Sequence, residues 1–394
     1  MTDHQQVHGL ALPRLADLLD KYRKDYSFFA SRRGAMLALG KSNVMDVPEL
    51  IRVMRQGKNG LPIMAAIPFS HHGGAHVVLP REVNIISGPH DAGLSKERTR
   101  RCPQAAQSLR RPVITAVPSA AAYCRNVEQA LAQIRGRAFE KVVLARSLTV
   151  EAGIDLPALL HRLTRSNPGG YTFALELAGA AGDHRSLVGA SPELLLAKRG
   201  RQVISNPLAG SIARSDDPLE DARRAQRLRR SAKDRHEHAL VVNAVAAALK
   251  PFCISMEVPA EPSLLSTQTM WHLSTEVKGE LGPGAPTSLE LALALHPTPA
   301  VCGYPSPAAY DFIRRVEGFD RGLFSGLVGW SNASGDGEWA VTIRCAEIGA
   351  AASIIYAGAG IVAGSEPEME LAETSAKMRT MLRAMNLESV LEVE

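Results

Sequence analysis

The sequence has little of the residues that crosslink small extracellular folds. Its 394 residues include only five cysteines, an odd number, and none of them stands in a CxxC pair or in a Cys/His cluster. This spacing indicates neither a disulfide framework nor a zinc site. Aromatic residues make up only 5% of the chain, so the sequence shows no stacking platform of the kind that binds single-stranded nucleic acids.

Long hydrophobic runs are also missing. No apolar stretch reaches the roughly 18 residues that identify a membrane-spanning helix. Residues 1–25 lack the charged-then-apolar pattern of a signal peptide. We therefore expect a cytoplasmic protein that does not enter a membrane.

What remains is the composition of a globular protein: 45% of residues are hydrophobic, 22% are charged, and the net charge is +5. The length allows one large domain or two ordinary ones. A small positive charge spread along the chain suits small anionic ligands. The arginine-rich stretches "DARRAQRLRRSAKDR" and "SKERTRRC" leave open a protein that binds nucleic acid or another anionic partner. Interleaved acidic residues and the lack of a reading motif weigh against that alternative.

Hydrophobic periodicity predicts the order of the elements. Helices are predicted over 8–24, 118–135, 156–165, 217–249, 287–295, 307–317 and 366–387, and strands over 28–40, 75–80, 139–150, 171–177, 185–196, 202–206, 272–281, 324–332, 338–348 and 353–358. Several strands follow one another without a helix between them, which favours an α+β fold with antiparallel sheet covered by helices. Residues 87–117 are basic and broken by prolines, and we interpret them as a connector.

Two predicted helices carry acidic ridges. Asp234 and Glu237 are three residues apart in "SAKDRHEH", and "GSEPEMELAETSAKMRT" places four residues on one helical face, Glu366, Glu370, Glu373 and Lys377. Two such ridges could face each other across a divalent cation, and Mg²⁺ prefers oxygen ligands. Judged by spacing alone, two solvated faces with ion pairs inside each helix are the commoner explanation.

Single polar residues in apolar surroundings are further candidates. Glu193 follows a proline and precedes three leucines in "GASPELLL", and Lys141 and Arg344 lie in apolar predicted strands. His272 follows a tryptophan in "TMWHLST". Anion binding or proton transfer would explain these residues, but strand-end surface charges and a core histidine are alternatives that the residues leave open.

Taken together and in order, these stretches resemble the chorismate-utilising enzymes. The stretches "KVVLAR", "GASPELLL", "PLAGS", "SAKDRHEH", "MWHLST", "LHPTPAVCG", "FDRGLFSG", "GDGEWAVTIRCAEI", "YAGAGIV" and "ELAETSAK" cover residues 118–388, with looser similarity over 25–85. Within the family, they are most similar to isochorismate synthases of the siderophore type. The resemblance implies the fold of anthranilate synthase component I, an α+β (α/β complex) fold with an antiparallel or mixed β-sheet sandwich covered by helices. It also implies one catalytic unit over 1–394, with a variable part at 1–117 that contains the connector and a chorismate-binding core at 118–390.

The resemblance further implies a reaction and a role for each matching residue. In the reaction, which depends on Mg²⁺, water attacks C2 of chorismate and the C4 hydroxyl leaves, giving isochorismate. Lys141 would be the general base and Glu193 the general acid. The implied metal ligands are Glu237 and Glu373, with Glu370 and Asp234 as direct or water-mediated helpers. The implied substrate-binding positions are Arg344, Lys377, His272, Gly210, Ser211, Ala300, Phe324, Tyr356, Gly358 and Gly360.

The chemistry is consistent with these residue types. Because water is a poor nucleophile and hydroxide a poor leaving group, a partly neutral lysine and a partly protonated glutamic acid are needed near neutral pH. A divalent ion would hold the dianionic substrate and offset its charge.

The resemblance also narrows the choice within the family. Relatives that use ammonia from a glutaminase subunit are expected to lack Lys141, so the implied protein is a monomer that acts on chorismate without such a partner. Salicylate synthases, which go on to eliminate pyruvate, tend to carry threonine at the position of Ala300 and tyrosine at that of Phe324. Isochorismate is therefore the expected product, and salicylate synthesis is the alternative.

Overall fold

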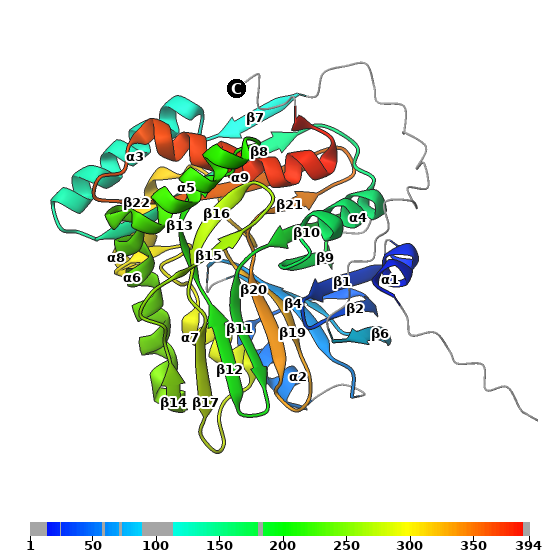
Figure 1. The fold of residues 1–394 in the computed structure, drawn as a ribbon. Coiled ribbons are helices and arrows are strands. Elements are labelled where there is room, and N and C mark those ends of the chain that lie inside the picture. Colours follow the sequence, from blue (N-terminus) through cyan, green and yellow to red (C-terminus); the bar gives the residue numbers. More distant parts are fainter. Residues whose placement is uncertain are drawn as a thin grey trace, which may run out of the picture.

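The computed structural model describes residues 14–23, 25–56, 60–70, 73–88, 113–179 and 184–388. These residues form two large β-sheets and one small sheet, with helices packed around them (Figure 1). The helices are α1 (Leu15–Lys21), α2 (Val47–Gln56), α3 (Ala120–Arg135), α4 (Leu156–Ser166), α5 (Pro218–Arg230), α6 (Ala232–Leu249), α7 (Ser288–Leu295), α8 (Ser306–Val316) and α9 (Pro367–Met385), and a short 3-10 helix covers Lys250–Phe252.

The first sheet has the strand order β18-β8-β22-β21-β10-β9-β1-β2-β6, and β7 also pairs with β8. Its strands are β1 (Tyr26–Ser31), β2 (Gly34–Leu39), β6 (Glu82–Ser87), β7 (Ile114–Val117), β8 (Lys141–Val150), β9 (Tyr171–Leu177), β10 (Arg185–Ser191), β18 (Gly303–Tyr304), β21 (Cys345–Ile348) and β22 (Ser353–Val362).

The second sheet has the order β14-β17-β12-β11-β20-β19-β4-β5-β3, and the small sheet has the order β13-β16-β15. Their strands are β3 (Ser42–Met45), β4 (Ile63–Ile67), β5 (Ala75–Val78), β11 (Leu194–Arg199), β12 (Gln202–Asn206), β13 (Leu208–Ala213), β14 (Cys253–Glu257), β15 (Ser263–Ser266), β16 (Met270–Ser274), β17 (Val277–Leu281), β19 (Leu327–Ser331) and β20 (Gly337–Val341). All recorded strand pairs are antiparallel. The predicted α+β class with antiparallel sheets is thereby confirmed.

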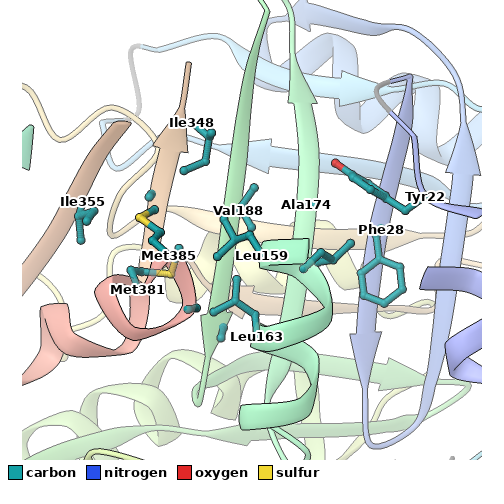
Figure 2. Packing of buried hydrophobic residues seen from close by; sticks show 14 of the residues in the cluster. Tyr22, Phe28, Leu159, Leu163, Ala174, Val188, Ile348, Ile355, Met381 and Met385 are labelled. Atoms are coloured by element: carbon teal, nitrogen blue, oxygen red, sulfur yellow. The ribbon is translucent and has the colours of Figure 1, made fainter. Parts of the chain in front are cut away.

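Alternate residues of the first sheet serve two different cores. In β1, Phe28 belongs to an outer cluster with α1, α4 and α9, whereas Phe29 belongs to the cluster between the two large sheets. Figure 2 shows the outer cluster, in which Leu159 of α4 and Met381 of α9 pack over strand residues such as Val188. Because both faces of these strands are buried, their sequences are almost continuously apolar, as expected for a strand covered on two sides.

The other helices complete the cover. Residues of α2, α6 and α7 pack with strands of the second sheet in one cluster, and residues of α3 and α8 pack with β8 and β22 in another. Helix α9 also contacts β22 and α3. The acidic ridges predicted on α6 and α9 therefore belong to helices that are packed against strands, not to free-standing solvated helices.

Several elements that the sequence predicts as continuous are interrupted in the structure, so these predictions are wrong in their bounds. The helix predicted over 217–249 is two helices, α5 and α6, which meet at Ser231, an extended residue whose hydroxyl accepts from the N–H of Asp234. The strand predicted over 185–196 is interrupted at 192–193 and the strand predicted over 338–348 at 342–344. At both interruptions the chain passes from one large sheet to the other.

Some predictions fall partly outside the described residues. The helix predicted at 8–24 is described from Leu15 onward, and most of the connector, 89–112, is not described. The last residues of that predicted connector form the strand β7, which pairs with β8. The division into a variable part and a core stays a prediction. Cys124, Cys253, Cys302 and Cys345 are free thiols, and within the ranges given above no helix is long and apolar enough to cross a membrane.

Candidate active site

A cavity with about 620 Å³ of empty space opens where the two large sheets, the small sheet and helices α6 and α9 meet. The structure brings most of the sequence-predicted residues to its lining: Glu193, Gly210, Ser211, Glu237, His272, Ala300, Phe324, Arg344, Gly358, Gly360, Glu373 and Lys377. Residues from nine separate parts of the sequence thus converge on one cavity, whereas Lys141 does not line it. The individual roles stay predictions.

Glu193 lies at the point where the chain leaves β10 of the first sheet and enters β11 of the second. Its side chain is buried, and its Oε1 accepts a 3.3 Å hydrogen bond from the N–H of Leu208. Burial raises the pKa of Glu193 to about 7, although Leu208, Lys141 and Arg344 each oppose the rise. The carboxyl is therefore partly protonated at neutral pH, and it can donate a proton into the cavity.

Arg344 lies at the second crossing between the sheets, between β20 and β21, with a positive φ of 51°. The two crossings are joined, because the N–H of Val341 donates to the carbonyl of Glu193 and the N–H of Ala190 donates to that of Arg344. A non-glycine residue in this left-handed region is uncommon and costs conformational energy. With this backbone conformation, the side chain of Arg344 lies in the same cavity as that of Glu193.

The guanidinium of Arg344 is buried and has no carboxylate contact within the described chain. Its Nη2 lies 3.3 Å from Nε2 of His272, which must be the acceptor because arginine only donates. Burial, followed by the Arg344 charge, lowers the pKa of His272 well below its usual value, so this histidine is neutral. Burial also lowers the pKa of Arg344 to about 10, which still leaves it charged at neutral pH. Arg344 feels the charges of Glu373 and Glu193 but forms no direct ion pair among the described residues. A buried cation in this state is well suited to bind a carboxylate.

Lys141 begins β8, and its Nζ lies 2.9 Å from Oε1 of Glu237 on α6. The two groups form a close ion pair, although their orientation does not meet hydrogen-bond geometry. Gly360 of β22 makes this approach possible. A Cβ added there would stand 2.2 Å from Oε1 of Glu237 and 3.1 Å from Cε of Lys141. Gly360 is therefore needed at this position because it has no side chain. The sequence instead suggested that its backbone binds an anion.

Glu373 of α9 connects the helix to the small sheet and to β22. Its Oε1 accepts a 3.0 Å hydrogen bond from the hydroxyl of Ser211 and lies 2.6 Å from Nζ of Lys377. The same lysine Nζ donates to the carbonyl of Gly358 at 2.8 Å. Burial alone would raise the pKa of Glu373, but Lys377, Ser211 and Lys233 together outweigh burial and the pKa is lowered. This carboxylate is therefore ionised at neutral pH.

Glu370 and Asp234 lie beside the cavity without lining it. Nζ of Lys233 lies 2.8 Å from Oε1 of Glu370, and burial together with the Glu373 charge raises the pKa of Glu370 to about 7. Burial also raises the pKa of Asp234, and the charges of Glu237 and Glu373 add to the rise. These mutual effects show that the acidic ridges of α6 and α9 face each other, as the sequence suggested.

The carboxylates of Glu237 and Glu373 fit a hard divalent cation. Glu237 is buried and Glu373 is half-buried, both line one cavity, and their charges add to the raised pKa of the neighbouring Asp234. Within the part of the chain that the structure describes, no three acidic, histidine or cysteine side chains converge closely enough to hold an ion alone. Mg²⁺ does not require such a cage, because one or two carboxylates with waters and substrate oxygens usually complete its shell.

Tyr356 is placed differently from the expectation. Its ring stacks on Phe324, with centroids 5.1 Å apart and planes 10° from parallel. Phe324 lines the cavity and Tyr356 does not, so the tyrosine backs the wall instead of facing a ligand. The sequence also gave no signal for several apolar lining residues, which are Val143, Pro192, Leu208, Ala209, Val301, Ile343 and Ala357.

Comparison with known proteins identifies relatives along nearly the whole chain. Residues 83–386 match the family described as "Chorismate binding enzyme". The chain is 47% identical over 392 residues to isochorismate synthase DhbC of Bacillus subtilis, a match that covers 95% of this chain and 96% of that protein.

Solved structures show the same fold. The structure is similar to that of DhbC from Bacillus anthracis, a protein assigned as a 2,3-dihydroxybenzoate-specific isochorismate synthase, with a TM-score of 0.85, 44% identity, and coverage of 94% of this chain and 99% of that one. It is also similar to anthranilate synthase component I from Streptococcus pneumoniae, with a TM-score of 0.70 and 21% identity, covering 91% and 90% of the two chains. The predicted fold of anthranilate synthase component I is thereby confirmed.

Replacing Glu193 with glutamine should change how stability depends on pH. A carboxyl whose folded pKa is about 7 and whose unfolded pKa is about 4.3 binds its proton more tightly in the folded state. Stability supplied by that proton is complete below the unfolded pKa and is lost as pH rises towards 7. Between pH 5 and 8 the wild type should therefore lose on the order of 2 kcal/mol relative to Glu193→Gln, measured by urea unfolding at each pH. Parallel pH profiles for the two proteins would contradict the raised pKa.

Replacing Gly360 with alanine should disturb the carboxylate that it faces. A methyl group 2.2 Å from Oε1 of Glu237 cannot be accommodated unless that side chain moves away from Lys141. We expect Gly360→Ala to fold but to lose at least roughly tenfold in divalent-cation affinity, because the ligand would be displaced. Titration calorimetry with Mg²⁺ provides the measurement. Gly153→Ala is the control, because a Cβ added there would meet no atom within 4 Å, its φ lies outside the left-handed region and it does not line the cavity. Equal affinities in the two variants would contradict the role given to Gly360.

Proposed function

The chain belongs to the family of chorismate-binding enzymes, and we propose that it isomerises chorismate to isochorismate. The observation that carries the proposal is Glu193, a buried carboxyl with a pKa of about 7, in a cavity that also contains the buried cation of Arg344, which forms no ion pair with the residues that the structure describes. A proton donor and a buried cation in one cavity suit the acid-assisted loss of a hydroxyl group from a substrate that carries carboxylates.

Substrate binding would use the cations that line the cavity. Chorismate is a dianion with one carboxylate on the ring and one on the enolpyruvyl group. The guanidinium of Arg344, held by His272, is placed to bind the enolpyruvyl carboxylate. Lys377 lies on α9, and its Nζ is already oriented by the carbonyl of Gly358 and the carboxylate of Glu373. Fixing both ends of the substrate positions the ring between the acid and the base.

Two proton transfers then complete the reaction. Lys141 accepts a proton from the water that bonds to C2, and Glu193 donates its proton to the C4 hydroxyl, which leaves as water. The ring double bonds shift between these positions, so one water enters and one leaves. The partial protonation required of Glu193 is supported by its raised pKa. The partly neutral state required of Lys141 stays a prediction.

We propose that Glu237 and Glu373 hold a Mg²⁺ ion, with Glu370 and Asp234 as outer helpers. When bound, such an ion supplies positive charge that orients the ring carboxylate and offsets its charge. Ser211 and Lys377 orient Glu373 for this task, and Gly360 leaves room for Glu237. The residues themselves thus provide an anionic site beside a cationic one.

The alternatives differ in their support. The two positions that favoured isochorismate over salicylate, Ala300 and Phe324, both line the cavity, and this supports a role for them in determining the product. The basic stretch that suggested an anionic macromolecular partner is partly neutralised by ion pairs, among them Arg224 with Glu220 and Arg235 with Glu261. We therefore retain isochorismate as the product and salicylate as the alternative.

The place of the reaction in metabolism follows from the relatives. We propose that isochorismate made here feeds siderophore synthesis through 2,3-dihydroxybenzoate or salicylate. The name of the Bacillus anthracis relative, which describes it as specific for 2,3-dihydroxybenzoate, supports the first of these two routes. We further propose that the protein works in the cytoplasm, as a monomer, and without a glutaminase subunit.

Incubation of the purified protein with chorismate and Mg²⁺, followed by chromatography, tests the proposal. We expect isochorismate to accumulate without salicylate or pyruvate and without a need for ammonia, because the lining residues match that outcome. Equal amounts of salicylate and pyruvate would establish the alternative product. An amino product that requires ammonia, or no conversion at all, would contradict the proposed reaction.

The metal site has a separate test. Replacing Glu237 with glutamine removes one of the two proposed anionic ligands, so Mg²⁺ affinity in the presence of chorismate should fall by at least roughly tenfold. Titration calorimetry measures that affinity without relying on turnover. Glu368→Gln is the control, because Glu368 lies exposed in the first turn of α9. Unchanged affinity in Glu237→Gln would remove this residue from the proposed site.

A further inference from the structure

A buried ion pair that the proposed reaction does not use lies behind the cavity. Glu317 is the capping residue directly after α8, and Arg321 follows it four residues later. Both side chains are only 2% exposed, and Nε of Arg321 donates to Oε2 of Glu317 at 2.8 Å while its Nη2 donates to Oε1. Taking two charges out of water is unfavourable unless many hydrogen bonds compensate. Such a pair therefore calls for an explanation.

The compensation comes from three separate segments of chain. Arginine has five N–H groups, and those of Arg321 that do not reach Glu317 donate to the carbonyl of Val301 at 2.8 Å, the carbonyl of Val143 at 2.7 Å and the hydroxyl of Ser325 at 3.5 Å. Oε1 of Glu317 in turn accepts from the N–H of Ala145 at 2.7 Å. The pair thus ties β8, the turn before β18 and the turn before β19 to one another.

The segments tied together form one wall of the cavity. Val143, Val301, Phe324 and Ser325 all line it, whereas Arg321 does not. Two groups pack near the ring of Phe324. The ring of Tyr356 stacks on it with centroids 5.1 Å apart, and the guanidinium carbon of Arg321 lies 5.8 Å from its centroid. Lys141, the proposed base, begins the same strand β8 whose carbonyl at Val143 is bound.

We infer that Arg321, anchored by Glu317, is a positioning residue that fixes this wall relative to β8 and so places the proposed base against the substrate ring. The inference rests on the proposed function for its substrate. The cations that bind the substrate lie elsewhere: Arg344 is on the crossing before β21, and Lys377 is on α9. Loosening the wall should therefore impair the chemical step much more than substrate binding.

Arg321→Lys tests the inference, because lysine keeps the charge but cannot span three segments with a planar fork. With chorismate as substrate, we expect kcat per folded molecule to fall roughly 100-fold, as a misplacement of about 1 Å can cause. The KM for chorismate, and its Kd by calorimetry, should change less than about threefold. Glu317→Gln should show the same split in weaker form, since its amide oxygen can still accept from Ala145 and Arg321.

Arg33→Lys is the matched control, because Arg33 also pairs with a buried carboxylate, Glu338, at 3.0 Å, and none of its recorded contacts reaches the cavity. It should lower the Tm while leaving kcat per folded molecule unchanged. If Arg321→Lys behaves like Arg33→Lys, the pair is purely structural and the inference is wrong. Equal losses in kcat and in substrate affinity would also contradict it, as would failure of both Arg321→Lys and Glu317→Gln to fold. Failure of the wild type to convert chorismate would instead contradict the proposed function.

Discussion

The burial of ionisable side chains between the two large sheets is the constraint on which the rest of the site depends. Lys141, Glu193 and Arg344 are each at most 7% exposed, and a charge in such surroundings must be paired, hydrogen-bonded or neutralised. The fold meets this need differently for each. Lys141 contacts a carboxylate, Glu193 retains its proton up to about pH 7, and Arg344 has only a neutral histidine as its hydrogen-bond partner among the described residues. The site is therefore electrostatically incomplete in a way that an anionic substrate would complete.

The crossings of the chain between the sheets produce this arrangement. Glu193 and Arg344 both lie at positions where a strand of one large sheet ends and a strand of the other begins. Backbone hydrogen bonds join the two crossings, so the acid and the cation enter the cavity side by side. Within β10 itself, by contrast, Leu187 and Val188 belong to the packed cores on its two faces.

Rigidity comes from contacts behind the lining. The ion pair of Glu317 with Arg321 uses its hydrogen bonds on three segments of one wall, while Lys377 and Ser211 hold the carboxylate of Glu373 on the opposite side. A site held in this way on strands and helices keeps its geometry when substrate binds. The small volume of Gly360 has the same importance as these contacts, since a larger residue would displace Glu237.

The sequence by itself determined the types of element, the antiparallel α+β class and the residues that could carry the chemistry. Continuous apolar runs, the helical spacing of acidic residues and the ordered motifs are local properties of the sequence, so they can be recognised without coordinates. Only the tertiary structure decided that the predicted strand containing Glu193 breaks at this residue, that Tyr356 supports Phe324 from behind, and that Arg321 binds the wall. These features depend on contacts between segments far apart in the chain, and local periodicity contains no information about which distant carbonyl or ring a side chain will meet.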